Sequence, residues 1–378
     1  MNTPFRPQQI AIVGAGASGC LCAYFLLNAG FEVTIFDKGS PLRTLLPTGG
    51  GRCNLAHAEY DFKELAKNYP RGEKFLYSVF SKFSTYDTLS LFSELGVETY
   101  TQENGRIFPT SNSARDVQEK ILSKIKKASI INENVLEVLP NKIKTCNAEY
   151  YFTDIVIATG GHAGYDIIKN LDIDIVTPKP SLVGLNTNNK APSGIVLKDV
   201  LSNDLKICDD LLFTHFGISG PLAYKISSIK ARENFPYKLS FDLYPKEIEL
   251  QKFLNNSPHK DVKNILADFL PSGFVKYILS DLADIKAHKI DGKTRDLILD
   301  KIHNFEVIVT GTNKGEETVT AGGVKLNEVN PKTMEAKKYP HIYFIGEILD
   351  IDGFCGGFNL QNAWSCLLYT SDAADDKA

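Results

Sequence analysis

Short apolar runs alternate with helical patterns at the start of the chain. Residues 10–13 form a continuous apolar run, which is typical of a strand buried in a parallel sheet. Residues 21–29 have the apolar spacing of a helix, and Gly30 is a residue type that commonly ends one. A second strand is predicted at residues 33–36, directly before Asp37. The pattern therefore predicts a strand–helix–strand unit with parallel strands.

The pattern of elements changes near residue 187. Before it, helical stretches such as 73–95 are mixed with predicted strands, the last of them at 155–158. After it, strands are predicted without intervening helices, and residues 246–303 then read as mostly helical. A strand at 307–310 follows. We therefore expect a module inserted between two halves of an α/β domain.

Composition excludes several classes of protein. The net charge is −3, so no overall basic field favours nucleic acid or an anionic membrane. The lysines around residues 120–127 are interpreted as the solvated face of a helix. The seven cysteines form no CxxC pair, so no metal site is predicted, and their odd number fits a reducing cytoplasm. No apolar run is long enough to span a bilayer, and no membrane association is predicted.

A GxGxxG motif follows the first predicted strand. Gly14 permits a tight turn, Gly16 lets a pyrophosphate approach the backbone, and Gly19 lets helix and strand pack closely. The N–H groups at the start of the helix favour phosphate. Asp37 is placed to bind the ribose hydroxyls of an adenosine. The candidate nucleotide-binding residues here are Gly14, Gly16, Ala17, Ser18, Gly19, Asp37 and Lys38. The motif alone leaves NAD and FAD open.

Three later glycine-rich segments favour FAD over NAD. The first, TGGGRCN at 48–54, suits backbone that lies along a cofactor. The second, ATGG at 158–161, closes a strand where such a sheet meets its ligand. In the third, a strand at 342–345 leads through glycines into a helix start, which would stabilise negative charge on a reduced flavin.

These segments together resemble the YhiN/BaiN-like FAD-binding flavoproteins, a family of NAD(P)/FAD-dependent, aminoacetone-oxidase-like oxidoreductases. The segments that carry the resemblance are GAGASG (14–19), TGGGRCN (48–54), ENGRIFP (103–109), ATGG (158–161), FTHFGISGP (213–221), TAGGV (320–324), EVNPKTME (328–335) and YFIGEILDIDGFCGGFNLQNAWS (343–365). They cover nearly the whole chain.

The resemblance implies an α/β fold with a Rossmann-like FAD-binding domain built from two chain segments and interrupted by a β-rich module with a helical insertion. The expected domains are 1–186 with 320–366 for FAD, 187–245 with 304–319 for the β-rich substrate side, and 246–303 for the insertion. By carry-over, further cofactor-binding residues are Gly50, Gly51, Arg52, Cys53, Asn54, Val135, Ala158, Thr159, Gly160, Gly161, Gly346, Glu347, Gly356, Gly357, Phe358, Asn359 and Leu360.

The end of the chain departs from the family pattern. After residue 365 the family continues its helix with small residues, whereas this chain has a short acidic stretch at 366–378. We expect 367–378 to be a non-native tail.

Catalysis by a flavin requires the protein to orient the substrate and to move one proton. His215 is the first candidate for acid/base work because its ordinary pKa lies near neutrality, although a structural histidine is the more frequent case. Cys53 and Cys355 are candidates for facing the flavin, with buried packing cysteines as the alternative. Only one GxGxxG is present, so NAD(P)H would act as a visiting electron donor without a domain of its own.

Four functions remain open from the sequence. The favoured one is an FAD-dependent oxidoreductase that transfers a hydride between FAD and a small molecule, by C=C reduction or by oxidation at an amine-bearing carbon. The alternative is an RNA-modifying flavoenzyme that forms dihydrouridine in ribosomal RNA, against which the mild acidity argues weakly. An NAD-dependent dehydrogenase and a non-catalytic flavin-binding module are the remaining interpretations. Neither charge nor motif specifies the oligomeric state.

Overall fold

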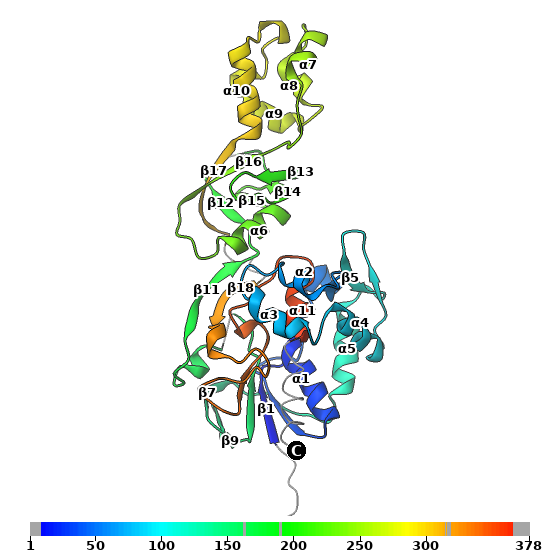
Figure 1. The fold of residues 1–378 in the computed structure, drawn as a ribbon, viewed down its shortest axis with the longest axis vertical. Coiled ribbons are helices and arrows are strands. Elements are labelled where there is room, and N and C mark those ends of the chain that lie inside the picture. Colours follow the sequence, from blue (N-terminus) through cyan, green and yellow to red (C-terminus); the bar gives the residue numbers. More distant parts are fainter. Residues whose placement is uncertain (1–8, 162–163, 189–190, 314, 316–318, 366–378) are drawn as a thin grey trace, which may run out of the picture. The chain divides into compact units, whose positions relative to one another are not determined.

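The computed structural model describes residues 9–161, 164–188, 191–313, 315 and 319–365. The chain divides into two compact units (Figure 1). The sheet unit contains residues 1–179 and 319–378, and the barrel unit contains residues 180–318. Each unit has its own hydrophobic core. The predicted tail at 367–378 lies outside the described residues.

A parallel sheet forms the centre of the sheet unit. Its strands, in spatial order, are β19 (Ile342–Phe344), β10 (Asp154–Ile157), β1 (Gln9–Val13), β2 (Glu32–Phe36) and β6 (Ser129–Ile131). All neighbouring pairs are parallel. The central strands are almost entirely buried, which is the reason for their continuous apolar runs. The predicted parallel α/β sheet is thereby confirmed.

Helices pack beside this sheet and connect its strands. They are α1 (Ala17–Asn28), α2 (Phe62–Ala66), α3 (Glu73–Phe80), α4 (Thr85–Glu94), α5 (Ala114–Lys124) and α11 (Phe358–Ser365). The prediction of a single helix at 73–95 was wrong, because a capping box formed by Ser84 and Asp87 starts a new helix there. Ser113 caps α5 and accepts a hydrogen bond from the backbone N–H of Asp116.

Smaller sheets complete the sheet unit. One contains β3 (Ala56–His57), β5 (Arg106–Pro109) and β4 (Thr99–Thr101), and another contains β7 (Val135–Leu139), β8 (Lys142–Thr145) and β9 (Glu149–Tyr151). β11 (Ile175–Ser181) pairs with β18 (Val319–Val324). Short 3₁₀ turns are η1 (Thr48–Gly51), η2 (Asp166–Ile168), η5 (Leu326–Glu328) and η6 (Gly346–Ile348).

The barrel unit is a closed barrel with a helical insertion. The barrel strands, in order, are β12 (Leu185–Thr187), β15 (Gly217–Ser219), β14 (Cys208–Phe213), β13 (Ile195–Ser202), β16 (Tyr237–Asp242) and β17 (Phe305–Thr312). The predicted boundary at residue 187 falls within β12. The helices are α6 (Gly220–Ile229), α7 (Leu250–Asn256), α8 (Val262–Leu266), α9 (Ser272–Leu279) and α10 (Gly292–His303), with 3₁₀ turns η3 (Ser280–Leu282) and η4 (Ala287–Lys289). The helices from α7 to α10 lie between β16 and β17 in the chain and form the insertion (Figure 1).

Among the described residues, no helix has both the length and the apolar character needed to cross a membrane.

Candidate functional site

Loops from four strands meet at the carboxyl edge of the parallel sheet. The backbone N–H of Gly14, after β1, donates to the carbonyl of Phe36 at the end of β2 over 2.8 Å. The N–H of Ala158, after β10, donates to the Val13 carbonyl over 2.8 Å, and the N–H of Ile345, after β19, donates to the Ile157 carbonyl over 3.0 Å. This is the edge at which open α/β sheets bind their ligands.

The glycines of the GxGxxG turn meet different requirements. Gly14 has φ +110°, and a Cβ there would lie 2.3 Å from the Ala158 carbonyl oxygen. A Cβ on Gly19 would lie 1.9 Å from the Gly14 carbonyl oxygen. A Cβ on Gly16 would meet nothing within 4 Å. Gly14 and Gly19 therefore allow the turn to pack, whereas Gly16 borders open space.

That open space faces the start of α1. Gly16 is the N-cap of α1, no side chain caps the helix, and its first turn contains no acidic residue. The first-turn N–H groups and the positive end of the helix dipole thus remain available to an anion. Ser18 in this turn lies against the β19 loop, because a Cβ on Gly346 would be 2.1 Å from the Ser18 hydroxyl oxygen. The arrangement fits a pyrophosphate.

Asp37 follows β2 and also stabilises the GxGxxG turn. Its carboxylate accepts one hydrogen bond from the N–H of Ala15 and another from the N–H of Gly39, both at 2.7 Å. Lys38 is exposed, and its carbonyl accepts a hydrogen bond from the Asn132 amide after β6. Asn132 was not predicted, since nothing in its local sequence marks it.

Residues 48–54 form a compact loop in left-handed backbone conformations. Gly49, Gly50, Gly51 and Cys53 have φ between +58° and +84°, which favours glycine. A Cβ on Gly50 would meet nothing within 4 Å, so this part of the loop also borders open space. The loop presents backbone rather than side chains, as expected for a segment that lies along a cofactor.

Polar side chains anchor this loop. The Arg52 guanidinium lies 4.3 Å from the centroid of the Phe108 ring, and its Nε donates to the Gly49 carbonyl over 3.3 Å. The Asn54 amide donates to the carbonyls of Ala56 and Ile107, and its oxygen accepts from the N–H of Gly357 over 3.0 Å. Asn54 therefore joins the loop to the glycines that precede α11.

The segment before α11 is fastened by its own side chains. Asn359 accepts a hydrogen bond from the N–H of Gly353 and donates one to the Gly353 carbonyl, both at 2.8 Å. The Tyr69 hydroxyl donates to the Phe358 carbonyl over 2.6 Å. Arg71 forms a bidentate ion pair with Asp352, whose side chain is fully buried. These long-range contacts fix where α11 begins.

His57 is a residue of the candidate site that was not predicted from the sequence. Its ring stacks on Phe358 at 4.6 Å, and its Nδ1 lies 3.1 Å from the Gly356 carbonyl oxygen. A Cβ on Gly105 would be 2.6 Å from its Nε2, so the ring packs between two loops. Burial lowers its pKa, which favours the neutral imidazole at pH 7. The signal available in the sequence was its position three residues after the loop at 48–54.

Buried hydroxyl groups surround the loop after β10. Thr159 Oγ1, Tyr165 Oη and Thr320 Oγ1 are buried and have no hydrogen-bond partner among the described residues. Buried polar atoms are normally paired, so these three suit a polar ligand. Gly160 has φ +78°, and Glu347 accepts a hydrogen bond from the N–H of Thr320 over 3.0 Å. The phosphates and ribityl chain of FAD fit this combination of features: buried hydroxyl groups, glycines that border open space, and a helix start without a side-chain cap.

The two predicted catalytic residues lie in different units. Cys53 is fully buried in the sheet unit, and burial raises the pKa of its thiol to about 12, against a smaller lowering by the Thr48 hydroxyl. His215 is exposed in the barrel unit, between β14 and β15, with its ring edge-on to Phe216. Their catalytic roles stay predictions. A buried thiol with so high a pKa is a poor proton donor.

The remaining predicted cofactor residues are spread over the sheet unit. Val135 is buried at the start of β7, opposite Thr145. Ala158 and Gly161 lie in the loop after β10, and a Cβ on Gly161 would be 2.7 Å from Thr320 Oγ1. Leu360 is half-buried in the first turn of α11. Ala17 is the first residue of α1.

Known proteins are similar to this chain over most of its length. A family model described as HI0933-like protein Rossmann domain matches residues 8–372. Similar proteins include the ribosomal RNA dihydrouridine synthases of Escherichia coli (strain K12), 29% identical with 94% of each chain covered, and of Haemophilus influenzae, 30% identical with 94% of this chain and 95% of that one covered.

Two further comparisons are more distant. The 3-dehydro-bile acid delta(4,6)-reductase of Clostridium scindens is 25% identical, with 98% of this chain and 100% of the relative covered. A solved 3-ketosteroid delta1-dehydrogenase from Sterolibacterium denitrificans has a TM-score of 0.52 at 10% identity, covering 98% of this chain and 100% of that chain, and shares the fold.

Proposed function

This chain belongs to the HI0933-like protein Rossmann domain family, and we propose that it reduces the C5=C6 bond of uridine in ribosomal RNA. It is an FAD-dependent oxidoreductase. The proposal concerns the substrate. That the protein uses NAD(P)H and that it is cytoplasmic remain predictions.

One observation carries the choice of substrate. The similarity to the ribosomal RNA dihydrouridine synthases extends over 94% of this chain, at 29% and 30% identity, so it includes the barrel unit and its insertion as well as the sheet unit. The net charge of −3 argues only weakly against RNA as the substrate. A net charge describes the whole surface, whereas phosphate contacts need only a local basic area.

The residues of the sheet unit would hold the cofactor. The start of α1 and Gly16 would receive the pyrophosphate, and the loop at 48–54 and the glycines before α11 would line the path toward the flavin. Reduced FAD supplies the hydride when bound. The chain's own contribution is to fix this path through the Asn54 and Asn359 amides and to exclude water from it.

The product requires a proton in addition to the hydride. Reduction of the C5=C6 bond places the hydride on C6 and a proton on C5, so a proton donor must lie beside the substrate. His215 remains our first candidate because it is exposed and therefore accessible to a substrate. Cys53 is fully buried, and its thiol is the weaker candidate.

Dihydrouridine formation in ribosomal RNA tests the proposed function. The purified protein, loaded with FAD, is incubated under anaerobic conditions with NADPH or NADH and with in-vitro-transcribed small- and large-subunit ribosomal RNA. We expect dihydrouridine in the digested nucleosides, measured by mass spectrometry, and none when FAD is removed. Reduction of the flavin without any dihydrouridine in either RNA would contradict the proposal.

A steroid-like enone is the second candidate substrate. The observation that favours it is the full-length similarity to the 3-dehydro-bile acid delta(4,6)-reductase at 25% identity. Both substrates contain a C=C bond conjugated to a carbonyl, so the same hydride chemistry applies. In the same assay, a 3-oxo-delta(4,6) bile acid replaces the RNA. Turnover of the bile acid in the absence of RNA turnover would support this second candidate.

A further inference from the structure

The end of the helical insertion brings two segments of chain together. Residues 258–261 lie beside 286–288, because Asp261 and Lys286 form a β-bridge. The N–H of Ala287 donates to the Lys260 carbonyl over 2.9 Å, and the N–H of His288 donates to the Pro258 carbonyl over 3.1 Å. Backbone hydrogen bonds therefore hold the two segments side by side, so that their side chains are presented at the same end of the insertion.

Three lysines at this end make no ion pair within the described part of the chain. They are Lys260, Lys289 and Lys293, and all three are exposed. The nearby carboxylates are engaged elsewhere, since Asp261 pairs with Lys286, Asp284 with Lys263, and Asp291 caps α10 by accepting from the N–H of Thr294. Asp291 keeps its negative charge, because a backbone N–H does not neutralise it, so the three lysines and Asp291 together leave a net charge of +2 at this end.

Two histidines directly precede two of these lysines in the sequence, His259 before Lys260 and His288 before Lys289. The rings of His259 and His288 are 5.7 Å apart, and both residues are exposed. Nδ1 of His288 lies 2.7 Å from the Pro258 carbonyl oxygen, which holds the ring in place. Exposed, oriented imidazole rings offer faces on which an unstacked base packs.

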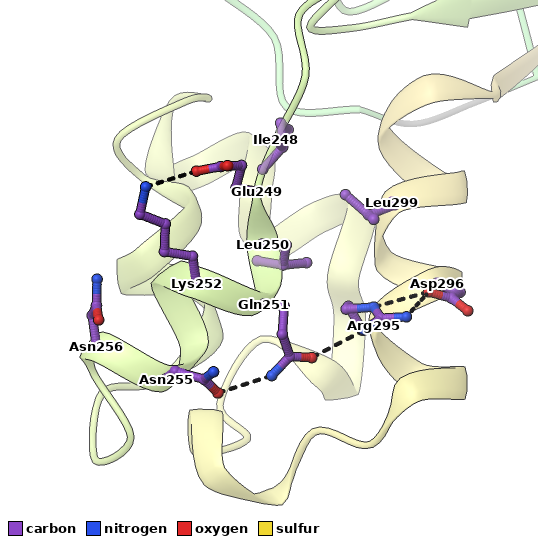
Figure 2. A pocket seen from close by; sticks show the side chains of 10 residues that line it. All are labelled: Ile248, Glu249, Leu250, Gln251, Lys252, Asn255, Asn256, Arg295, Asp296 and Leu299. Carbon is purple, nitrogen blue, oxygen red and sulfur yellow. Dashed lines mark hydrogen bonds and ion pairs between the residues drawn. The ribbon is translucent and has the colours of Figure 1, made fainter.

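A groove of about 600 Å³ lies between α7 and α10 in the same insertion, and both polar side chains and the apolar Ile248, Leu250 and Leu299 line it (Figure 2). Its carboxylates, Glu249 and Asp296, are paired with Lys252 and Arg295. Figure 2 shows Gln251 between Asn255 and Arg295, to which it is hydrogen-bonded at 2.9 and 3.0 Å. Ion pairing leaves the groove without net charge, while its amides supply the donors and acceptors that base edges require.

We propose that this end of the insertion, the basic tip formed by His259, Lys260, His288, Lys289 and Lys293, binds ribosomal RNA. The proposal rests on the proposed function and deepens it by assigning RNA binding to a surface. The lysines would contact phosphates, and the groove beside them would contact bases or ribose. The tip explains how a chain with a net charge of −3 recognises RNA: the uncompensated charge is local.

Salt-dependent RNA binding tests the proposal. The triple variant Lys260→Ala, Lys289→Ala, Lys293→Ala is compared with the full-length FAD-loaded protein on in-vitro-transcribed ribosomal RNA, by filter binding at several KCl concentrations. Loss of three phosphate contacts reduces the slope of log K against log salt by about 2. We expect binding at ~0.1 M salt to weaken roughly tenfold to a hundredfold.

A second triple variant provides a control matched in charge. Lys124→Ala, Lys126→Ala, Lys127→Ala removes three exposed lysines of the sheet unit, none of which forms an ion pair within the described residues. We expect this variant to bind RNA within about twofold of the unchanged protein. Flavin absorbance and thermal melting establish that both variants remain folded, because neither touches the glycine loops.

The outcomes separate this proposal from the proposed function. If both triple variants weaken binding equally, or if the tip variant changes nothing, the tip is not the RNA-binding surface, even where dihydrouridine still forms. If duplex DNA of equal length binds with the same dependence on the tip, RNA is wrong as the class of ligand. If the tip variant alone weakens binding but no dihydrouridine forms, the tip proposal stands and the proposed function fails.

Discussion

At the scale of the single residue, the glycines of the candidate site meet different structural requirements. Gly14 and Gly19 have no room for a Cβ, whereas Gly16 and Gly50 border open space. The first pair is needed for folding. Gly50 is also required by its backbone, because its φ is +68°, whereas Gly16 is needed only if something occupies that space.

Substitution of Gly16 by alanine tests this distinction. The backbone of Gly16 has φ −78°, which alanine adopts readily, so we expect little change in the free energy of unfolding. The added methyl group would enter the space assigned to pyrophosphate, and FAD affinity should fall by at least about tenfold, or ~1.4 kcal/mol. Affinity is measured by flavin fluorescence on titration of the apoprotein.

Gly292→Ala is the matched control for this substitution. Gly292 also has nothing within 4 Å of a built Cβ and no positive φ, but it lies in the barrel unit. We expect it to leave FAD affinity unchanged. Equal affinity of the Gly16→Ala variant and the unchanged protein would show that no cofactor lies against Gly16.

Two buried thiols make stability depend on pH above 9. Burial raises the pKa of Cys20 to about 12, with a smaller contribution from the charge of Asp37, and burial likewise raises the pKa of Cys53 to about 12. Both values compare with 9.0 in the unfolded chain. The folded state favours the neutral thiol. The neutral buried thiols therefore stabilise the folded state fully below pH 9, and this stabilisation is lost as the pH rises from 9 toward 12.

Cys20→Ala should reduce this loss of stability. Raising the pH from 8 to 10 should lower the free energy of unfolding by about 1.4 kcal/mol for each buried thiol. The variant has one such thiol fewer, so it should lose less stability between these pH values than the unchanged protein does. Urea unfolding at both pH values measures the difference. The exposed Cys146 provides the control, because Cys146→Ala should leave the pH dependence as it is. An identical pH dependence in all three proteins would contradict the prediction.

At the scale of elements, the position of α11 depends on contacts with distant parts of the chain. The Trp364 indole N–H donates to the Leu55 carbonyl over 2.9 Å, and the Gln361 amide donates to the Thr88 hydroxyl over 2.8 Å. Asp352 anchors the preceding loop to Arg71. The flavin-side end of the proposed cofactor path is therefore held by Leu55, Thr88 and Arg71, which are far from it in the sequence.

Asp352→Asn tests that anchor. The substitution removes a fully buried negative charge that Arg71 faces, and it should lower the free energy of unfolding by about 3 kcal/mol. FAD retention should fall with it, because the loop before α11 loses its buried ion pair with Arg71. Urea unfolding and flavin absorbance after gel filtration measure the two effects.

Asp172→Asn gives a contrast within the same unit. Asp172 also forms an ion pair, with Lys338, but its side chain is 87% exposed. Its loss should cost less than about 1 kcal/mol. Equal costs for the two substitutions would mean that burial does not decide the contribution of the Arg71–Asp352 pair.

At the scale of the whole molecule, the candidate FAD residues and the insertion belong to different units. The glycine loops, Glu347 and α11 lie in the sheet unit, which has its own core, while the basic tip lies in the barrel unit. The sheet unit alone should therefore bind FAD. In a variant with 180–318 replaced by a flexible linker between β11 and β18, we expect FAD content close to that of the full chain and no RNA binding.

This prediction requires evidence that the shortened variant folds. Circular dichroism and gel filtration establish folding, and the absorbance spectrum measures bound flavin. A folded but colourless sheet unit would mean that FAD needs residues of the barrel unit.

Local features of the fold could be predicted from the sequence because their causes are local. The strands at 10–13 and 33–36 are largely apolar because both faces of the sheet are covered, and the glycines at 14 and 19 are needed by the turn itself. Periodicity nevertheless missed the break between α3 and α4. The capping box that causes it was present in the sequence, but an apolar pattern on both sides concealed it.

Long-range contacts could not be predicted, and they decide the candidate site. The sequence by itself determined the α/β class, the family resemblance and the glycine segments, since each depends on residues adjacent in the chain. Only the tertiary structure decided that His57 stacks on Phe358, that Asn54 holds Gly357 and that Cys53 is fully buried. The physical reason is that a residue's burial and partners depend on which segments pack against it, and in these cases the segments are separated by most of the chain.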